Sequence, residues 1–227
     1  MSEFDPITDR YDKMVSKSIA FGGQEHEHYT RRKADALVDL ATRQLGDPTR
    51  LRALDVGCGI GLTDGMLVGR FGELHGVDLA RAAVERAAAT NPGVEYQSYD
   101  GTRLPYDDES FDLAFAICVV HHIAVNERLT FATELRRVVR PGGVVALFEH
   151  NPCNPLTRIA VSRCDFDEDA ILLGRRRASK LLRASGLESV DQRFIVFLPF
   201  ERRWSAPLER GLKWLPLGAQ YYVAARK

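Results

Sequence analysis

A glycine-rich segment, ALDVGCGIG at residues 53–61, has the residue types and spacing of a turn that binds a small molecule. Its glycines alternate, at Gly57, Gly59 and Gly61. Glycine accepts positive φ and, because it has no Cβ, lets the backbone come close to a ligand. Apolar residues before the turn predict a buried strand, and the residues after it predict a helix with free N–H groups at its start. A tight strand-to-helix turn without a ligand is the alternative.

The spacing of the glycines separates two kinds of nucleoside site. A dinucleotide-binding turn has its third glycine three positions after the second, and Leu62 occupies that position in this chain. A seat for a pyrophosphate is therefore disfavoured. Asp55 stands just before the glycines, where a buried acid can orient the turn or accept a hydrogen bond from a ligand amine. Asp55 and Cys58 are therefore included with the glycines as cofactor-binding candidates.

A second acid, Asp78 in the segment HGVDLA, ends the next predicted strand. A carboxylate in this place can accept hydrogen bonds from both hydroxyls of a ribose, and its charge discourages a 2′-phosphate. The neighbouring Leu79 is grouped with it as a candidate. Asp78 can also cap the helix predicted to begin at Ala80, and the two roles are compatible.

A third acid, Asp100, follows the next predicted strand and precedes Gly101 and Thr102. Its carboxylate can accept from the exocyclic amine of adenine, while the backbone N–H of Gly101 or Thr102 meets a ring nitrogen. Asp-Gly on its own is a common turn. In series with the glycine turn and Asp78, this acid predicts an adenosyl pocket along one edge of a sheet.

Short apolar runs alternate with helical patterns along the chain, which predicts βαβ units, a mostly parallel sheet and an α/β fold. The predicted strands are 51–56, 74–77, 94–97, 111–120, 144–148, 193–198 and 220–225, and the predicted helices are 30–45, 62–70, 80–90, 127–139 and 175–184. The Pro-Gly-Gly at 141–143 predicts a turn, and the last two strands are expected to pair antiparallel.

The composition is that of an ordinary globular protein, with 227 residues, 45% of them hydrophobic and 27% charged, which suits one domain over 1–227. Lys and Arg balance Asp and Glu at 31 each, so nothing favours a nucleic acid or an anionic membrane as partner. The four cysteines lack Cys-x-x-Cys spacing. No segment approaches the roughly 18 apolar residues of a membrane helix. We expect a cytoplasmic monomer or homodimer without stable membrane insertion.

Taken together, the motifs resemble the class I S-adenosylmethionine-dependent methyltransferases, particularly the small single-domain enzymes. The matching pieces are LDVGCGIG, VDLA, the acid of YDGTRLPYDDESFDLAF, the strand AICVVHHI and the segment LRRVVRPGGVVALFEHNP, in the family's order. The resemblance covers about residues 51–150. It implies a Rossmann-like sheet of seven mostly parallel strands with the last strand antiparallel and helices on both faces. It also implies S-adenosyl-L-methionine as cofactor.

Carried over residue by residue, the resemblance places Gly57 and Gly59 against the methionine part of the cofactor and Asp78 at the ribose. Asp100 and Gly101 would hold adenine. The main chain near Cys118 would meet the amino-acid end. A methyl group on a sulfonium is already activated, so the main task of the protein is to hold a nucleophile in line with it and to exclude water.

Histidines at two predicted strand ends are the candidate catalytic residues. His121 and His122 follow the fourth strand, where the transferring methyl is expected, and histidine titrates near neutrality. His122 is the first choice as a general base, which a neutral hydroxyl acceptor needs and an acidic phenol does not. Members of the family often carry histidines here without needing them chemically. Glu149, His150 and Asn151 are alternative bases or substrate hydrogen-bonding groups.

The N-terminal segment 1–29 is expected to act as a lid, and it contains the pair His26 and His28. Because no third ligand is in view, we expect no metal site. Two long connections, 150–173 and 199–218, are expected to line the substrate pocket. Arginines favour carboxylate or phosphate acceptors, and tryptophans favour rings or sugar faces. The alternative for both connections is a flap that packs its aromatic residues on the domain.

The sequence therefore predicts methyl transfer to a small-molecule acceptor in a biosynthetic pathway. Oxygen is the expected target, because it is common in the resembling group, while transfer to nitrogen or carbon stays open. A nicotinamide-dependent oxidoreductase is the alternative from another class, and Leu62 argues against it. RNA and protein acceptors are disfavoured, because FAICVV replaces the Asn/Asp-Pro-Pro-Tyr/Phe motif that is typical of amino methylation on bases.

Overall fold

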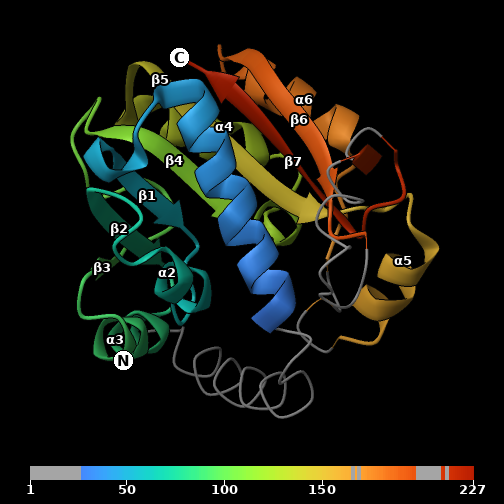
Figure 1. The fold of residues 1–227 in the computed structure, drawn as a ribbon, viewed down its shortest axis with the longest axis horizontal. Coiled ribbons are helices and arrows are strands. Elements are labelled where there is room, and N and C mark those ends of the chain that lie inside the picture. Colours follow the sequence, from blue (N-terminus) through green and yellow to red (C-terminus); the bar gives the residue numbers. More distant parts are fainter. Residues whose placement is uncertain (1–26, 165–166, 168–169, 198–210, 213–214) are drawn as a thin grey trace.

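Seven strands form one sheet in the order β3-β2-β1-β4-β5-β7-β6 (Figure 1). The computed structural model describes residues 27–164, 167, 170–197, 211–212 and 215–227. Its elements are a helix over 27–45, η1 (Pro48–Arg50), β1 (Arg52–Val56), α2 (Leu62–Leu67), β2 (Glu73–Asp78), α3 (Arg81–Thr90), β3 (Glu95–Ser98), β4 (Phe111–Ile117), η2 (Val120–His122), α4 (Arg128–Val138), β5 (Val139–His150), α5 (Pro155–Ser162), α6 (Arg175–Ala184), β6 (Glu188–Ile195) and β7 (Gln220–Arg226).

The first five strands are parallel to their neighbours, and β7 lies antiparallel between β5 and β6. This topology confirms the predicted Rossmann-like class, including the antiparallel last strand. The chain returns to the same end of the sheet before each parallel strand begins. The carboxyl ends of β1, β2, β4 and β5 therefore lie at one edge of the sheet. Among the described residues, no helix has the length and apolar character needed to cross a membrane.

Both faces of the sheet are buried, which explains the near-continuous apolar runs of its central strands. In β5, Val144, Ala146 and Phe148 pack in one hydrophobic cluster with the helix 27–45 and α2. Val145 and Leu147 point the other way and pack in a second cluster with α4 and α6. Side chains alternate along a strand, so a single strand serves two cores. Figure 1 shows the helix 27–45 in blue, running across one face.

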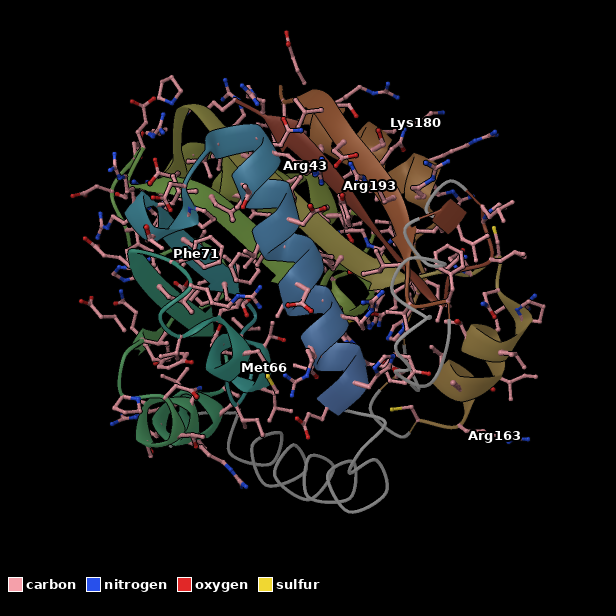
Figure 2. All side chains as sticks on the ribbon, viewed as in Figure 1. Arg43, Met66, Phe71, Arg163, Lys180 and Arg193 are labelled. Carbon is pink, nitrogen blue, oxygen red and sulfur yellow. The ribbon has the colours of Figure 1, made fainter. Side chains whose placement is uncertain are left out.

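A polar contact joins the helix 27–45 to the far edge of the sheet. The guanidinium of Arg43 donates to Asp191 Oδ2 at 2.6 Å and to the hydroxyl of Tyr222 at 3.0 Å. Arg193 lies 3.6 Å from Asp39 on the same helix. Figure 2 shows Arg43 and Arg193 at this junction. These partly buried contacts connect the helix to β6 and β7, next to its apolar packing.

Several predicted boundaries were wrong, each for a local reason. The Pro-Gly-Gly predicted as a turn lies inside β5, where Gly142 has φ +80° and donates to the carbonyl of Lys227. β4 ends at Ile117 rather than at residue 120, because Cys118 has φ +60°. β6 begins at residue 188 and ends at 195, ahead of the predicted 193–198. The helix α5 was not predicted, although Asn154 caps it by accepting from two backbone N–H groups.

The Pro-Gly-Gly segment inside β5 generates a stability prediction at Gly143. A Cβ there would lie 2.5 Å from Val139 Cγ1 and 2.7 Å from the backbone oxygen of Asp112, which cannot move aside alone. We expect Gly143→Ala to lower the free energy of unfolding by about 2 kcal/mol or more. Gly174→Ala is the control, since its Cβ would meet only Pro152 Cγ at 3.7 Å, and should cost about 1 kcal/mol or less. Equal midpoints for the two variants in urea unfolding would contradict the prediction.

Candidate active site

The glycine turn follows β1 at the edge where the carboxyl ends of the parallel strands meet. Gly57 has φ +84°, and a Cβ on it would lie 2.4 Å from Val119 Cγ2. Gly61 has φ +72°, and its Cβ would lie 2.5 Å from the side-chain nitrogen of Asn91. The backbone N–H groups of Gly57 and Cys58 both donate to the carbonyl of Val77 in β2. The turn is therefore bonded to β2 and lies close to Val119, and at these two positions glycine is required.

Asp78 ties the end of β2 to the turn and to the next helix. Its Oδ2 accepts from the N–H of Gly59 at 2.8 Å, and its Oδ1 accepts from the N–H of Ala80 at 2.9 Å. Burial raises the pKa of this carboxyl against the lowering effect of these N–H groups. A carboxylate oxygen has two lone-pair sites, so both oxygens keep capacity for a ribose. The N-cap role expected for Asp78 is wrong, because α3 begins at Arg81 with Ala80 as its N-cap and without a side-chain capping bond; the ribose-binding role stays a prediction.

Two buried acids lie beneath the turn. Asp55 and Asp64 are 2% and 0% exposed, and one oxygen of each has no hydrogen-bond partner among the described residues. The other oxygen of Asp64 accepts from the hydroxyl of Tyr96 at 2.8 Å, and Asn91 donates both to that hydroxyl and to the carbonyl of Gly61. Burial raises the pKa of both acids, and the charge of Asp64 raises that of Asp55 further. Sequence reasoning identified Asp55 and missed Asp64, whose only signal was an acid in the first turn of α2.

Asp100 forms a turn of its own. Its Oδ1 accepts from the backbone N–H and the hydroxyl of Thr102, at 2.9 and 2.7 Å, and these bonds lower the pKa of the carboxyl. Leu79 is 54% exposed, and a Cβ on Gly101 would lie 3.1 Å from Leu79 Cδ2. The exposed apolar side chain and the Asp-Gly turn are therefore neighbours. An adenine ring packed on Leu79 with its amine near Asp100 is sterically reasonable and stays a prediction.

Cys118, which follows β4, contributes to the site through its backbone rather than through its sulfur. Its N–H donates to the carbonyl of Phe148 at 2.8 Å, and its positive φ turns the chain toward η2. Its Sγ accepts from the side-chain nitrogen of Gln220 at 3.5 Å, and burial raises the pKa of the thiol. The backbone conformation, which carries the next residues across the end of the sheet, is the feature by which Cys118 positions the histidines.

His121 is held between two carboxylates. Its Nδ1 lies 2.5 Å from Glu149 Oε2, and its Nε2 lies 3.2 Å from Asp167 Oδ1. Burial opposes a charge on this ring, but the hydrogen bonds to Asp167 and Glu149 outweigh it and raise the pKa of His121 to about 10. Glu149 Oε1 accepts in turn from the N–H of Val120 at 2.8 Å. Both ring nitrogens are thus occupied, which disfavours the predicted role of His121 as a base.

His122 and His150 flank this ion cluster. Burial and the charge of His121 lower the pKa of each to about 4. The side chain of His122 is 30% exposed, with Nε2 3.5 Å from Asp167 Oδ1. His150 Nδ1 lies 3.5 Å from the amide nitrogen of Gln220. The three histidines expected from the sequence therefore do gather, and Asp167, which follows α5, joins them although no spacing rule had connected it to the site.

Other residues singled out by the sequence have different places. Asn151, offered as a substrate-binding group, is buried and donates to the carbonyls of Pro216 and Gly218, so it fastens the segment before β7. His28 is 8% exposed on the helix 27–45. His26, most of the expected lid 1–29, and residues 199–210, 213 and 214 of the expected insertion 199–218 lie outside the described residues.

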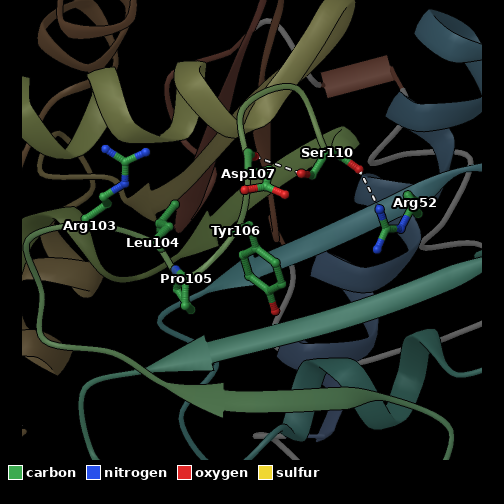
Figure 3. A pocket seen from close by; sticks show the side chains of 7 residues that line it. All are labelled: Arg52, Arg103, Leu104, Pro105, Tyr106, Asp107 and Ser110. Carbon is green, nitrogen blue, oxygen red and sulfur yellow. Dashed lines mark hydrogen bonds between the residues drawn. The ribbon is translucent and has the colours of Figure 1, made fainter.

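A cavity of about 520 Å³ lies at the opposite edge of the sheet (Figure 3). Its lining residues are Arg52, Arg103, Leu104, Pro105, Tyr106, Asp107 and Ser110. Arg52 begins β1 and donates to the carbonyl of Ser110, just before β4. Since the glycine turn and the histidines lie at the carboxyl ends of these strands, the cavity is not the predicted cofactor pocket.

Sequence comparison finds known proteins that resemble this chain over the strands and turns that form the site. Residues 54–147 match a family model described as a methyltransferase domain. A ubiquinone biosynthesis O-methyltransferase from Rhizobium etli is 27% identical over 181 residues, covering 74% of this chain and 72% of the relative. A 27-O-demethylrifamycin SV methyltransferase from Amycolatopsis mediterranei is 30% identical over 156 residues, covering 63% of this chain and 55% of the relative.

Solved structures share the fold at lower sequence identity. An S-adenosylmethionine-dependent methyltransferase from Thermotoga maritima, described as a possible histamine N-methyltransferase, aligns with a TM-score of 0.68 at 17% identity, covering 97% of this chain and 98% of that one. The [4+2]-cyclase SpnF aligns with a TM-score of 0.61 at 21% identity, covering 85% and 81%. These likenesses show the fold, and the cyclase shows that the fold carries more than one kind of reaction.

The buried acids generate a prediction for stability against pH. Asp64 lies near Asp55 and Tyr96, and the pKa of Asp55 also responds to the charges of Asp78 and Lys33. Because the folded pKa values of Asp55 and Asp64 lie above their unfolded values, the folded state binds these protons more tightly. This contribution to stability is therefore present at low pH and is lost as pH rises from the ordinary carboxyl pKa of about 4 through the raised values.

We expect Asp64→Asn to stabilise the protein at pH 8, since its amide can donate to Asp55 while its oxygen still accepts from Tyr96. The gain should exceed about 1 kcal/mol, the free energy of roughly one pKa unit. It should vanish near pH 4. The measurement is urea unfolding of both proteins across this range, and a difference that does not change with pH would contradict the prediction.

Proposed function

Since this chain is a class I S-adenosylmethionine-dependent methyltransferase, we propose that its acceptor is a small molecule methylated on a hydroxyl oxygen. The observation that carries the proposal is the position of the histidine cluster. His121 and His122 follow β4 and His150 ends β5, beside the glycine turn that follows β1. The cofactor and acceptor regions therefore adjoin at one edge of the sheet.

The residues of the turn fit the cofactor in shape and in charge. A Cβ on Gly57 or Gly61 would collide with Val119 or Asn91, so the two glycines let the turn adopt this shape against its protein neighbours. The unpartnered oxygen of Asp55 lies buried beneath the turn, where it suits an ammonium group acting directly or through a water. Asp78 retains acceptor capacity for ribose hydroxyls, and Leu79 exposes an apolar surface beside Gly101. S-adenosylmethionine would supply a methyl group on a positively charged sulfur.

The protein's part in the transfer is to position the acceptor oxygen and to keep water away. His121 has both nitrogens against carboxylates, whereas the side chain of His122 is 30% exposed. We therefore assign to His122 the direct contact with the acceptor hydroxyl. His121, Glu149 and Asp167 hold η2 in place through their ionic hydrogen bonds.

Oxygen as the target is supported by the names of the relatives. The Rhizobium etli relative is an O-methyltransferase, and the Amycolatopsis mediterranei relative methylates a 27-O-demethyl compound by its name. The N-methyltransferase likeness concerns the fold alone at 17% identity. A nicotinamide-dependent oxidoreductase is disfavoured, because Leu62 stands where that turn has a glycine.

Cofactor binding is tested at Asp78 by calorimetry with S-adenosylhomocysteine. Asp78→Ala removes the acceptor of two backbone N–H groups and of the ribose, so we expect affinity to fall about tenfold or more, equivalent to about 1.4 kcal/mol or more. The matched control is Asp107→Ala, an exposed acid in the cavity of Figure 3. A loss with Asp107→Ala and none with Asp78→Ala would place the cofactor in that cavity instead.

The acceptor is tested by transfer of a labelled methyl group from S-adenosylmethionine to a panel of phenols, catechols, alcohols and amines. We expect hydroxyl compounds to be methylated, and His122→Asn to lower kcat/KM about tenfold, the effect of one lost hydrogen bond of about 1.4 kcal/mol. Its affinity for S-adenosylhomocysteine should not change. The exposed Cys153→Ser is the control. Transfer to amines alone would overturn the assignment to oxygen.

A further inference from the structure

Three potential metal-binding side chains converge at the end of the sheet, and they come from three separate segments. His121 belongs to η2, His150 ends β5, and Asp167 follows α5. One nitrogen of each histidine and one carboxylate oxygen of Asp167 all lie within 4.8 Å of one another. His121 Nε2 and Asp167 Oδ1 are 3.2 Å apart. Donor atoms of a tetrahedral zinc site, with bonds of about 2.1 Å, lie about 3.4 Å apart, so small side-chain movements would complete a site.

The outer contact of His121 has the arrangement found around bound metals. Glu149 Oε2 lies on Nδ1 of His121, which leaves Nε2 to face Asp167. The carboxylate is itself fixed by the N–H of Val120. A carboxylate that accepts from the far ring nitrogen fixes the ring of a ligating histidine and favours metal binding by the near nitrogen, and Glu149 has this position on His121. The side-chain nitrogen of Gln220 lies 3.5 Å from Nδ1 of His150 and can only donate to it, so this contact gives no such support at His150.

The charges of the cluster also suit a cation. Glu149 is 1% exposed and the side chain of Asp167 is 10% exposed. Buried carboxylates need a positive partner or a metal ion, and His121 lies between these two. A divalent ion bound to His121, His150 and Asp167 would balance both carboxylates.

We propose that His121, His150 and Asp167 bind a divalent first-row transition-metal ion such as Zn²⁺. Two imidazoles and one carboxylate are ligands that such ions share, and hard ions such as Mg²⁺ prefer oxygen alone. Three protein ligands leave coordination positions open. An acceptor oxygen could occupy one of these positions, and this use of the ion rests on the proposed function. Binding of the ion itself does not rest on the proposed function.

The experiment measures metal binding directly, without cofactor or acceptor, so its result is independent of methyl transfer. Protein freed of metal with a chelator is titrated with Co²⁺, followed by visible absorption, and with Zn²⁺ in a calorimeter. We expect one ion per chain. His150→Gln and Asp167→Asn should each weaken binding about tenfold or more, while binding of S-adenosylhomocysteine shows that the variants are folded.

His122→Gln is the matched control, because His122 adjoins the same Asp167 but lies outside the three-residue set. It should change the affinity for Co²⁺ less than threefold. Three results would overturn the proposal: no binding by the unaltered protein, equal affinity in all variants, or an intense near-ultraviolet thiolate band, which would indicate a cysteine ligand such as Cys118. Loss of binding in His122→Gln alone would overturn this choice of ligands.

Discussion

The parallel alignment of β1, β2, β4 and β5 is the constraint on which the site depends. Each of these strands ends at the same edge, so the residues that follow them are neighbours in space although they are far apart in the chain. Apolar burial on both faces fixes the register, because a slip by one residue would exchange the two cores of β5. The polar groups at the strand ends are therefore positioned by hydrophobic packing in the interior.

The polar residues at this edge are stabilised in two different ways. Asp78 is satisfied by backbone N–H groups of the turn that it positions. Asp55 and Asp64 lie deeper, and one oxygen of each has no hydrogen-bond partner among the described residues, so the fold tolerates an incompletely satisfied pair. Near β5, Glu149 and Asp167 lie against the two ring nitrogens of His121. A buried polar cluster costs stability unless it is fully paired, so these clusters are where function and stability compete.

The sequence was sufficient for the sheet and for the cofactor side of the site, because both depend on local patterns. Alternating apolar runs and helices predicted the order of the elements, and glycines and acids at strand ends predicted the turn. Contacts between distant segments were not predictable. Asp64 was missed because its partner Tyr96 lies two strands away, and Asp167 because it contacts His121 across 46 residues of sequence. Asn151 was misjudged because its partners precede β7.

The difference between the cofactor side of the site, which depends on local patterns, and the histidine cluster, which depends on distant segments, bears on how one fold supports different reactions. The turn after β1 is bonded to β2 and lies against Val119, whereas the histidine cluster also contacts Gln220 of β7 and Asp167 after α5. Substitutions after β5 can therefore alter the acceptor region while leaving the glycine turn intact. The likeness to a [4+2]-cyclase is consistent with this division, because the same sheet carries a different reaction there. The chemistry of this chain consequently depends on the groups around His121 more than on the sheet that positions them.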